Sequence, residues 1–99
     1  MDKIIEEEQP TLEIDEDGTK RWCLHDKTHR TDGPAIEYAD GYKAWWLNNE
    51  LHREYGPAVE WADGYKEWWL NNIKYSFTQF IAITPIPEVE KTRLMLIYA

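Results

Sequence analysis

The chain has 99 residues, a single cysteine and a formal net charge of -8. This length suits one domain with one core, and a lone Cys excludes an internal disulfide. No apolar run approaches the about eighteen residues that a membrane span requires, and no basic-then-apolar leader opens the sequence. The sequence therefore predicts a single soluble, cytoplasmic domain over residues 1–99 without a membrane partner.

The negative charge is concentrated at the N-terminus. Residues 1–17 hold eight acids against one lysine, a charge of -7, and residues 18–99 account for the remaining -1. Acidic runs of this kind are typical of solvated segments, so residues 1–10 are predicted to form a flexible arm. The charge disfavours direct binding to nucleic acid. An alternative function is an acidic DNA mimic that occupies the basic groove of a DNA-handling enzyme.

A 23-residue repeat organises the middle of the chain. Residues 29–51 and 52–74 are identical at sixteen of twenty-three positions, and a partial copy lies upstream, around residues 17–24. In each full copy one alternating run leads into Asp-Gly and a second leads out to Asn-Asn, which is typical of β-hairpins. The sequence predicts a mainly β fold in which about two and a half antiparallel hairpin units over residues 11–75 form a meander-like sheet.

Two hairpin registers fit these units. A two-residue Asp-Gly loop places Ile36 opposite Trp45, but it also places Glu60 opposite Glu67, which is a like-charge pair. A three-residue loop with a Gly bulge pairs Glu60 with Lys66 instead, and the partial first copy fits that register better. We expect the two-residue loop in the two full units and keep the three-residue loop as the alternative.

Two rows of side chains alternate along the second run of each copy. One row is unchanged in all three copies, as Lys, Trp and Leu, whereas the other accepts Arg, Ala and Glu at one place. An unchanged apolar row is expected to pack, and a variable row is expected to face solvent. The predicted core therefore contains Trp22, Trp45, Trp68, Leu24, Leu47 and Leu70, and the more exposed face carries Trp46 and Trp69.

Residues 76–99 are predicted to form a small helical cap. Ser76 is a suitable N-cap for a short helix that ends at Thr84-Pro85. The charge order after Pro87, acids first and bases later, favours a second helix over residues 87–97. The alternative for residues 93–98 is a terminal strand. Either element would cover a sheet edge that is otherwise prone to aggregation.

The motifs His-Arg-x-x-Gly-Pro-Ala, Asp-Gly and Trp-x-x-Asn together resemble a tandem repeat of many small phage and bacterial proteins, loosely similar to MORN repeats. The resemblance covers about residues 10–75. It implies a row of antiparallel hairpins, often in phage accessory proteins, without a shared reaction. The chain departs from the usual pattern at Asn49 and Asn72, where such repeats generally have Gly, and at Tyr55, where the first full copy has Asp32.

No residue set indicates catalysis or a cofactor. Cys23, His25 and His29 are of the types that bind zinc, but no fourth ligand is defined. Cys23 with a neighbouring His is also of the types used in nucleophilic catalysis, but nothing else supports that role. No Gly-rich phosphate loop or Ser-His-Asp order is present. The sequence predicts a protein that is not an enzyme and that carries neither a metal nor a cofactor.

The repeated pairs His29-Arg30 and His52-Arg53 have two interpretations. In the structural one, each guanidinium stacks on an indole or pairs with a nearby carboxylate within the repeats. In the functional one, the pairs form a stripe that holds phosphate or carboxylate, which Arg matches with two parallel hydrogen bonds. Both interpretations fit the sequence.

The doubled Trp beside polar neighbours predicts a protein-binding surface, since exposed aromatic residues anchor interfaces and Arg adds polar specificity. With the resemblance, it indicates a phage-type accessory protein that binds and inhibits a host defence protein. One alternative is a nucleotide-binding module in which rings stack on a base. Another is a self-associating module that forms homo-oligomers through open hairpin edges. The predicted partner-binding residues are Trp46, Trp69, Tyr42, Tyr65, Arg30 and Arg53.

Overall fold

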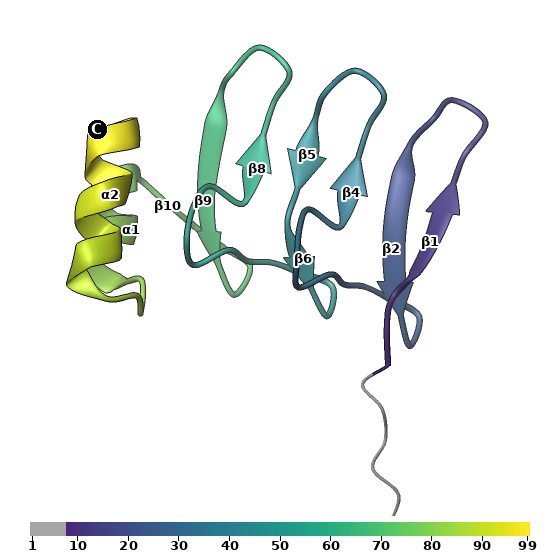
Figure 1. Ribbon diagram of the computed structural model, residues 1–99, viewed down its shortest axis with the longest axis horizontal. Helices are drawn as coiled ribbons and strands as arrows, with labels where there is room; N and C mark the ends of the chain where they lie inside the picture. The colour runs from purple at the N-terminus through teal and green to yellow at the C-terminus, as the bar shows by residue number, and fades with distance from the viewer. Residues whose placement is uncertain (1–7) are drawn as a thin grey trace, which may run out of the picture.

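The computed structural model describes residues 8–99, so residues 1–7 of the predicted arm lie outside the described part. The hairpins stand side by side, with their Asp-Gly turns along one edge, and the helices follow at the C-terminal end (Figure 1). The main sheet has the order β1-β2-β4-β5-β8-β9-β10, with β3 beside β2, and β6 pairs with β7. The strands are β1 (Thr11–Ile14), β2 (Lys20–Leu24), β3 (Lys27–Thr28), β4 (Ile36–Glu37), β5 (Lys43–Ala44), β6 (Trp46–Leu47), β7 (Glu50–Leu51), β8 (Val59–Glu60), β9 (Lys66–Leu70) and β10 (Ile73–Tyr75). The fold is mainly antiparallel β with a small helical cap, as predicted.

The Asp-Gly hairpins use the three-residue loop, so the two-residue register expected for the full units is wrong. Glu60 pairs with Lys66 rather than lying opposite Glu67. In the equivalent loop of the preceding unit, the N–H of Gly41 donates to the carbonyl of Tyr38 at 3.0 Å, and Gly41 has a φ of +106°. Gly adopts this conformation without steric cost. The bulge therefore forms readily and replaces a like-charge pair with an opposite-charge pair.

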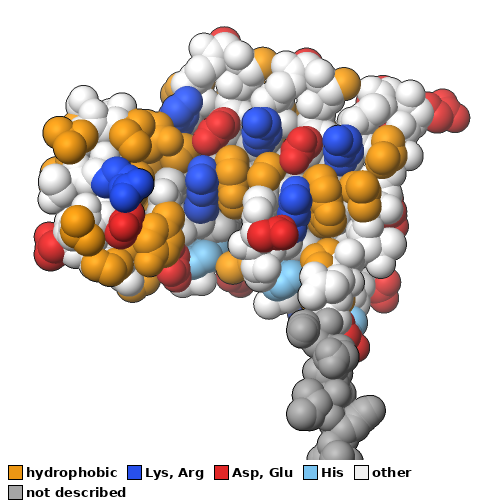
Figure 2. Space-filling model, viewed as in Figure 1, with side chains coloured by type: hydrophobic (Ala, Val, Ile, Leu, Met, Phe, Trp, Pro, Cys, Tyr) orange, Lys and Arg blue, Asp and Glu red, His pale blue; other side chains and the backbone are white. Residues whose placement is uncertain are grey.

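This register aligns a ladder of alternating charges across five strands. The cross-strand partners follow one another as Lys20, Glu37, Lys43, Glu60 and Lys66. The ladder crosses the face seen in Figure 2, with blue and red side chains in alternation. Opposite charges at directly paired positions stabilise a sheet by about 0.2–1 kcal/mol each. This alignment places unlike charges opposite one another within each hairpin and between neighbouring hairpins, and the glutamates of the ladder make their ion pairs with Arg30 and Arg53.

The Asn-Asn turns close the opposite edge of the array. Asn48 and Asn49 have φ values of 49° and 67°, as a two-residue hairpin turn of the type I′ requires. The N–H of Asn49 donates to the carbonyl of Thr28 at 2.9 Å, and its side-chain Oδ1 accepts from the N–H of Thr28 at 2.8 Å. Asn72 makes the same two bonds to Leu51. Asn takes the positive φ that Gly would also take, and in addition it ties each unit to the preceding one.

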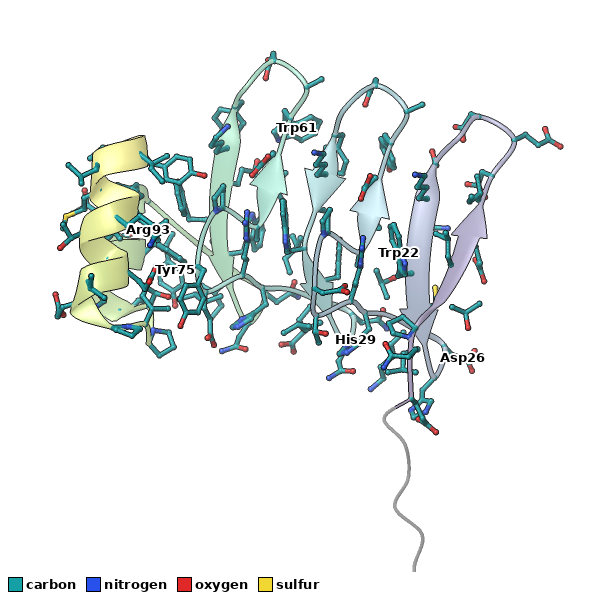
Figure 3. All side chains as sticks on the ribbon, in the orientation of Figure 1. Trp22, Asp26, His29, Trp61, Tyr75 and Arg93 are labelled. Atoms are coloured by element: carbon teal, nitrogen blue, oxygen red, sulfur yellow. The ribbon has the colours of Figure 1, made fainter. Side chains whose placement is uncertain are left out.

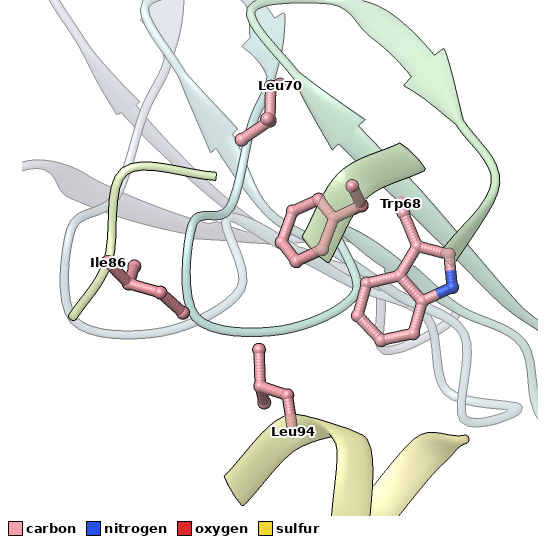
Figure 4. Close-up of a cluster of buried hydrophobic side chains, with 5 residues drawn as sticks. Trp68, Leu70, Ile86 and Leu94 are labelled. Atoms are coloured by element: carbon pink, nitrogen blue, oxygen red, sulfur yellow. The ribbon is translucent and has the colours of Figure 1, made fainter. Parts of the chain in front are cut away.

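The C-terminal cap consists of helices α1 (Phe77–Ile83) and α2 (Glu88–Tyr98), which makes the alternative strand over residues 93–98 wrong. Ser76 begins α1 with a complete capping box in which Gln79 is the reciprocal partner. Neither helix has the length and apolar character needed to span a membrane. The main hydrophobic cluster lies between the last unit and this cap (Figure 4) and contains Trp68, Leu70, Phe80, Ile86 and Leu94.

The two side-chain rows differ less in burial than predicted. Trp68 and Leu70 are buried because the cap covers them, but the equivalent residues of the earlier copies lie outside the main cluster. Ala44 belongs to the row expected to face solvent, yet it is fully buried between Ile36 and Val59 of the neighbouring strands. Both faces of the sheet are thus partly covered. Four of the residues predicted for the core are only half-buried, namely Trp22, Trp45, Leu24 and Leu47. The two residues predicted for the exposed face, Trp46 and Trp69, are half-buried as well.

Candidate protein-binding face

Four aromatic side chains form a row on the face of the sheet opposite the charge ladder, and three of their rings are in contact. They follow or precede ladder residues by one position, and successive side chains of a strand point to opposite faces. The ring centroids of Tyr38 and Tyr42 are 4.8 Å apart, and those of Tyr42 and Trp61 are 4.7 Å apart. The N–H of Trp61 donates to the carbonyl of Tyr65 at 2.8 Å, which makes that pair direct neighbours. We call these four residues the aromatic row; Figure 3 marks Trp61 beside β8.

Most of the aromatic row is open to solvent. Tyr38 and Trp61 are each 46% exposed and Tyr65 is 54% exposed, whereas Tyr42 is half-buried between its neighbours. Burial raises the pKa of Tyr42 above 10.0, and the nearby Tyr38 and Glu67 raise it further. Contiguous exposed apolar surface of this kind is uncommon away from binding sites. The row is therefore a candidate for an interaction surface in the described part of the chain.

Carboxylates border the aromatic row at the Asp-Gly turns. We call the exposed acids Asp15, Glu16, Asp17, Asp40 and Asp63 the acidic rim. Three of them, one in each turn, accept a backbone N–H two residues further on at 3.0–3.1 Å. The hydrogen bonds from Thr19 lower the pKa of Asp17. An open depression of about 480 Å³ lies where the rim meets Tyr38. The face thus combines aromatic rings with negative charge.

The sequence identified part of this face. Of the residues predicted to bind a partner, Tyr42 and Tyr65 lie in the row, whereas Trp46 and Trp69 are half-buried rather than exposed. The indole Nε1 of Trp69 donates to Glu67 at 2.9 Å. The indole Nε1 of Trp46 is buried and has no acceptor among the described residues, because Ala44 stands at the position of Glu67. These two indoles pack against the sheet and leave the row to the tyrosines and Trp61.

Tyr38 and Trp61 are the members of the row that the sequence analysis missed. Each ends the first run of its unit, immediately before Ala-Asp-Gly. The signal was an aromatic residue at the same place in both full copies, one position after the repeated Glu. This repeated aromatic residue falls beside Tyr42 or Tyr65 only when the two runs of a unit pair in the three-residue register. The row therefore depends on the register that was not expected.

The two repeated arginines lie on the other face and stack on indoles of the preceding unit. The guanidinium carbon of Arg30 is 3.8 Å from the centroid of Trp22, and that of Arg53 is 3.9 Å from Trp45. Arg53 Nη1 also donates to the carbonyl of Pro57 at 3.0 Å. Burial lowers the pKa of Arg53, and the nearby Glu60 opposes that shift. These contacts are those of the structural interpretation, and they separate both arginines from the aromatic row.

A groove of about 500 Å³ lies between the two full units, on the face of the stacked arginines. It is the place where a nucleotide would have to bind if the His-Arg pairs held phosphate. Its cations already have intrachain partners, since Arg30 Nε donates to Asp32 at 2.8 Å and Arg53 pairs with a glutamate. His52 Nδ1 accepts the N–H of Asn71 at 2.9 Å. A phosphate would have to displace carboxylates, which disfavours this alternative.

Cys23, His25 and His29 do not form a metal site. Among residues 8–99, no group of three or more His, Cys, Asp or Glu side chains is arranged to hold a metal ion. His29 Nδ1 accepts the backbone N–H of Asn48 at 3.0 Å, so its ring contacts the Asn-Asn turn of its own unit. Cys23 is a half-buried free thiol. The two histidines of the repeat thus accept hydrogen bonds from the Asn-Asn turns of their units.

Comparison with protein-family models, with curated proteins and with solved structures found no match for this chain. The repeat resemblance stays an expectation from the motifs. What the chain does is therefore inferred from the aromatic row, the acidic rim and the stacked arginines.

Proposed function

We propose that this chain is a non-enzymatic protein-binding module that holds a partner protein on its aromatic row. One observation carries the proposal: Tyr38, Trp61 and Tyr65 are each about half exposed, although Tyr38 and Trp61 both pack against the ring of Tyr42. Large aromatic side chains supply most of the binding energy of typical protein interfaces. A partner that covers these rings would remove their exposed apolar surface from water, which favours association.

The backbone that carries the aromatic row is suited to binding a partner protein. The rings flank the Asp-Gly turns, one position beyond the strands of the ladder, and the backbone N–H groups of Tyr38 and Trp61 donate to the carbonyls of Tyr42 and Tyr65 at the base of each turn. A backbone that is ordered before binding lowers the entropy lost on binding. Tyr42, half-buried between Tyr38 and Trp61, fixes both neighbours in position. A partner therefore meets a preformed surface.

The wider role follows the repeat resemblance. In this proposal the partner is a host protein, the chain acts as a phage-type accessory protein, and inhibition results when the row covers a surface that the host protein needs. No step of chemistry by this chain is involved. In this proposal the stacked arginines stabilise the fold, and the aromatic row and the acidic rim bind the partner.

Affinity capture with matched variants tests the proposal. Immobilised wild-type chain, Trp61→Ala and Tyr55→Ala are exposed to the same host lysate, after circular dichroism shows that all three are folded. Tyr55 is 52% exposed, close to the 46% of Trp61, but it lines the groove on the other face. The wild type and Tyr55→Ala should retain the same protein, and Trp61→Ala should lose it. Retention by Trp61→Ala would contradict the proposal.

A further inference from the structure

From the charges beside the aromatic row, we infer that the partner segment bound there is basic: an extended stretch that contains Arg or Lys. This inference rests on the proposed function and names the chemistry of its ligand. Four carboxylates of the acidic rim lie next to the rings: Asp15, Asp17 and Asp40 line the depression with Tyr38, and Asp63 lies in the turn between Trp61 and Tyr65. Two bases lie close to the rim, Arg21 in the depression and Lys66, whose Nζ donates to the carbonyl of Gly64 at 3.2 Å.

Aromatic faces and carboxylates attract the same ligand. The face of an indole or phenol ring carries partial negative charge and binds a cation placed over it. A carboxylate at the rim of the same ring can accept hydrogen bonds from that cation. Asp63 lies in the turn that joins Trp61 to Tyr65, and Asp40 lies in the turn that joins Tyr38 to Tyr42. Each ring pair therefore has a carboxylate in its own turn.

The other face of the molecule already contains this combination. Arg53 lies over the ring of Trp45 while its Nη1 is 3.4 Å from Glu60 Oε2. Arg30 lies over the ring of Trp22 while its Nε donates to Asp32 at 2.8 Å. In both cases a guanidinium is held between an indole and a carboxylate. A basic side chain from a partner would make the same contacts with the row and the rim.

The dimensions of the row fit a short extended segment. Neighbouring strands lie about 4.8 Å apart, so the four rings span about 14 Å. An extended peptide advances about 3.3 Å per residue and directs alternate side chains to one side. About five residues thus cover the row, with two or three side chains on the rings. The depression beside Tyr38, lined by Asp15, Asp17 and Asp40, accepts a further cation at the end of the row.

The test measures binding of two fluorescein-labelled octapeptides by fluorescence anisotropy at physiological salt. One peptide alternates Arg with Ser, and the other alternates Glu with Ser. The site variants are Trp61→Leu, which keeps apolar bulk without a π face, and the pair Asp40→Asn with Asp63→Asn. Asn keeps the Oδ1 acceptor for the N–H of the turn. The control pair, Glu50→Gln with Glu88→Gln, removes the same charge from exposed positions outside the row and rim.

The Arg peptide should bind the wild type, and the Glu peptide should not. Trp61→Leu should weaken binding by about two- to fivefold, the size of an exposed cation–π contact, and the Asp pair should weaken it by a similar factor. The control pair should bind like the wild type. Equal weakening by both charge pairs would show general attraction to an acidic protein and overturn the inference. Absence of Arg-peptide binding would also overturn it, and if Trp61→Ala still lost the captured partner, the proposed function would stand without it.

Discussion

The guanidinium carbon of Arg53 lies 3.9 Å from the centroid of the Trp45 ring, and a Cβ at Gly56 would come within 2.8 Å of the same carbon. Arg30 and Trp22 repeat this arrangement in the preceding unit, at 3.8 Å. The guanidinium thus fills the space between an indole and a glycine that cannot carry a side chain. The spacing of His-Arg-x-x-Gly-Pro-Ala follows from this layered contact, which joins each unit to the one before.

Gly56→Ala should destabilise the protein by about 1 kcal/mol, because the added methyl group pushes the guanidinium of Arg53 off Trp45. Urea unfolding measures the change. The same substitution in an Arg53→Ala background should cost much less, since no guanidinium remains to be displaced. Additive costs in the double-mutant cycle would contradict the layered arrangement.

Asn72 should tolerate Gly better than Ala. Gly keeps the turn, in which residue 72 has a φ of 68°, and loses the side-chain acceptor for the N–H of Leu51. That loss should cost about 0.5–1 kcal/mol, and Ala adds about 1 kcal/mol or more of left-handed strain. Urea unfolding gives the order, and faster amide exchange at Leu51 should accompany both changes. Equal stability of the two variants would mean that the turn does not impose the positive φ.

Phe80 should be the most sensitive position of the cap. Its side chain is fully buried, and its ring centroid lies 5.0 Å from that of Trp68. Phe80→Ala should cost about 3–5 kcal/mol. Leu96→Ala on α2 is the control, because Leu96 is 83% exposed and its loss should change stability by less than about 0.5 kcal/mol. Thermal unfolding of both variants measures the two losses. A loss for Phe80→Ala as small as that for Leu96→Ala would show that the core does not lie at the cap.

Stability should fall above about pH 10 in part because of Tyr42. Its pKa in the folded chain is raised above 10.0, chiefly by burial. In the range between the unfolded and folded pKa values, the unfolded chain releases the phenol proton while the folded chain keeps it, so rising pH favours unfolding. Below that range the contribution is fully present. Tyr42→Phe should lose less stability than the wild type between about pH 9 and pH 11, as measured by urea unfolding. An identical loss would contradict the assignment.

The elements that the sequence predicted correctly depend on local residue chemistry. The Asp-Gly and Asn-Asn turns need residues that adopt positive φ, and Ser76 supplies a helix cap within three residues of its partner Gln79. The period of 23 residues places these signals at fixed intervals. Such features do not require knowledge of which strands meet, and the fold class therefore follows from the sequence.

The register and the full binding face depend on contacts between units. A single hairpin offers two nearly equivalent loops, and the observed one places Lys43 opposite Glu37 in its own unit and opposite Glu60 in the next. Tyr38 and Trp61 join the row through the same alignment. The cap also buries Trp68 but leaves Trp22 and Trp45 half-buried. The three tryptophans occupy the same position of the repeat, so the repeat pattern alone does not reveal this difference. These outcomes are set by neighbours that are distant in sequence.

Photocrosslinking tests the binding face most directly. Benzoylphenylalanine is incorporated in place of Trp61 in one variant and in place of Tyr55 in another, and both are irradiated with the captured partner. The account predicts a crosslinked product from position 61 and none from position 55, because the partner covers the aromatic row and leaves the groove free. A product from position 55 with none from position 61 would show that the partner binds the other face and would contradict the account.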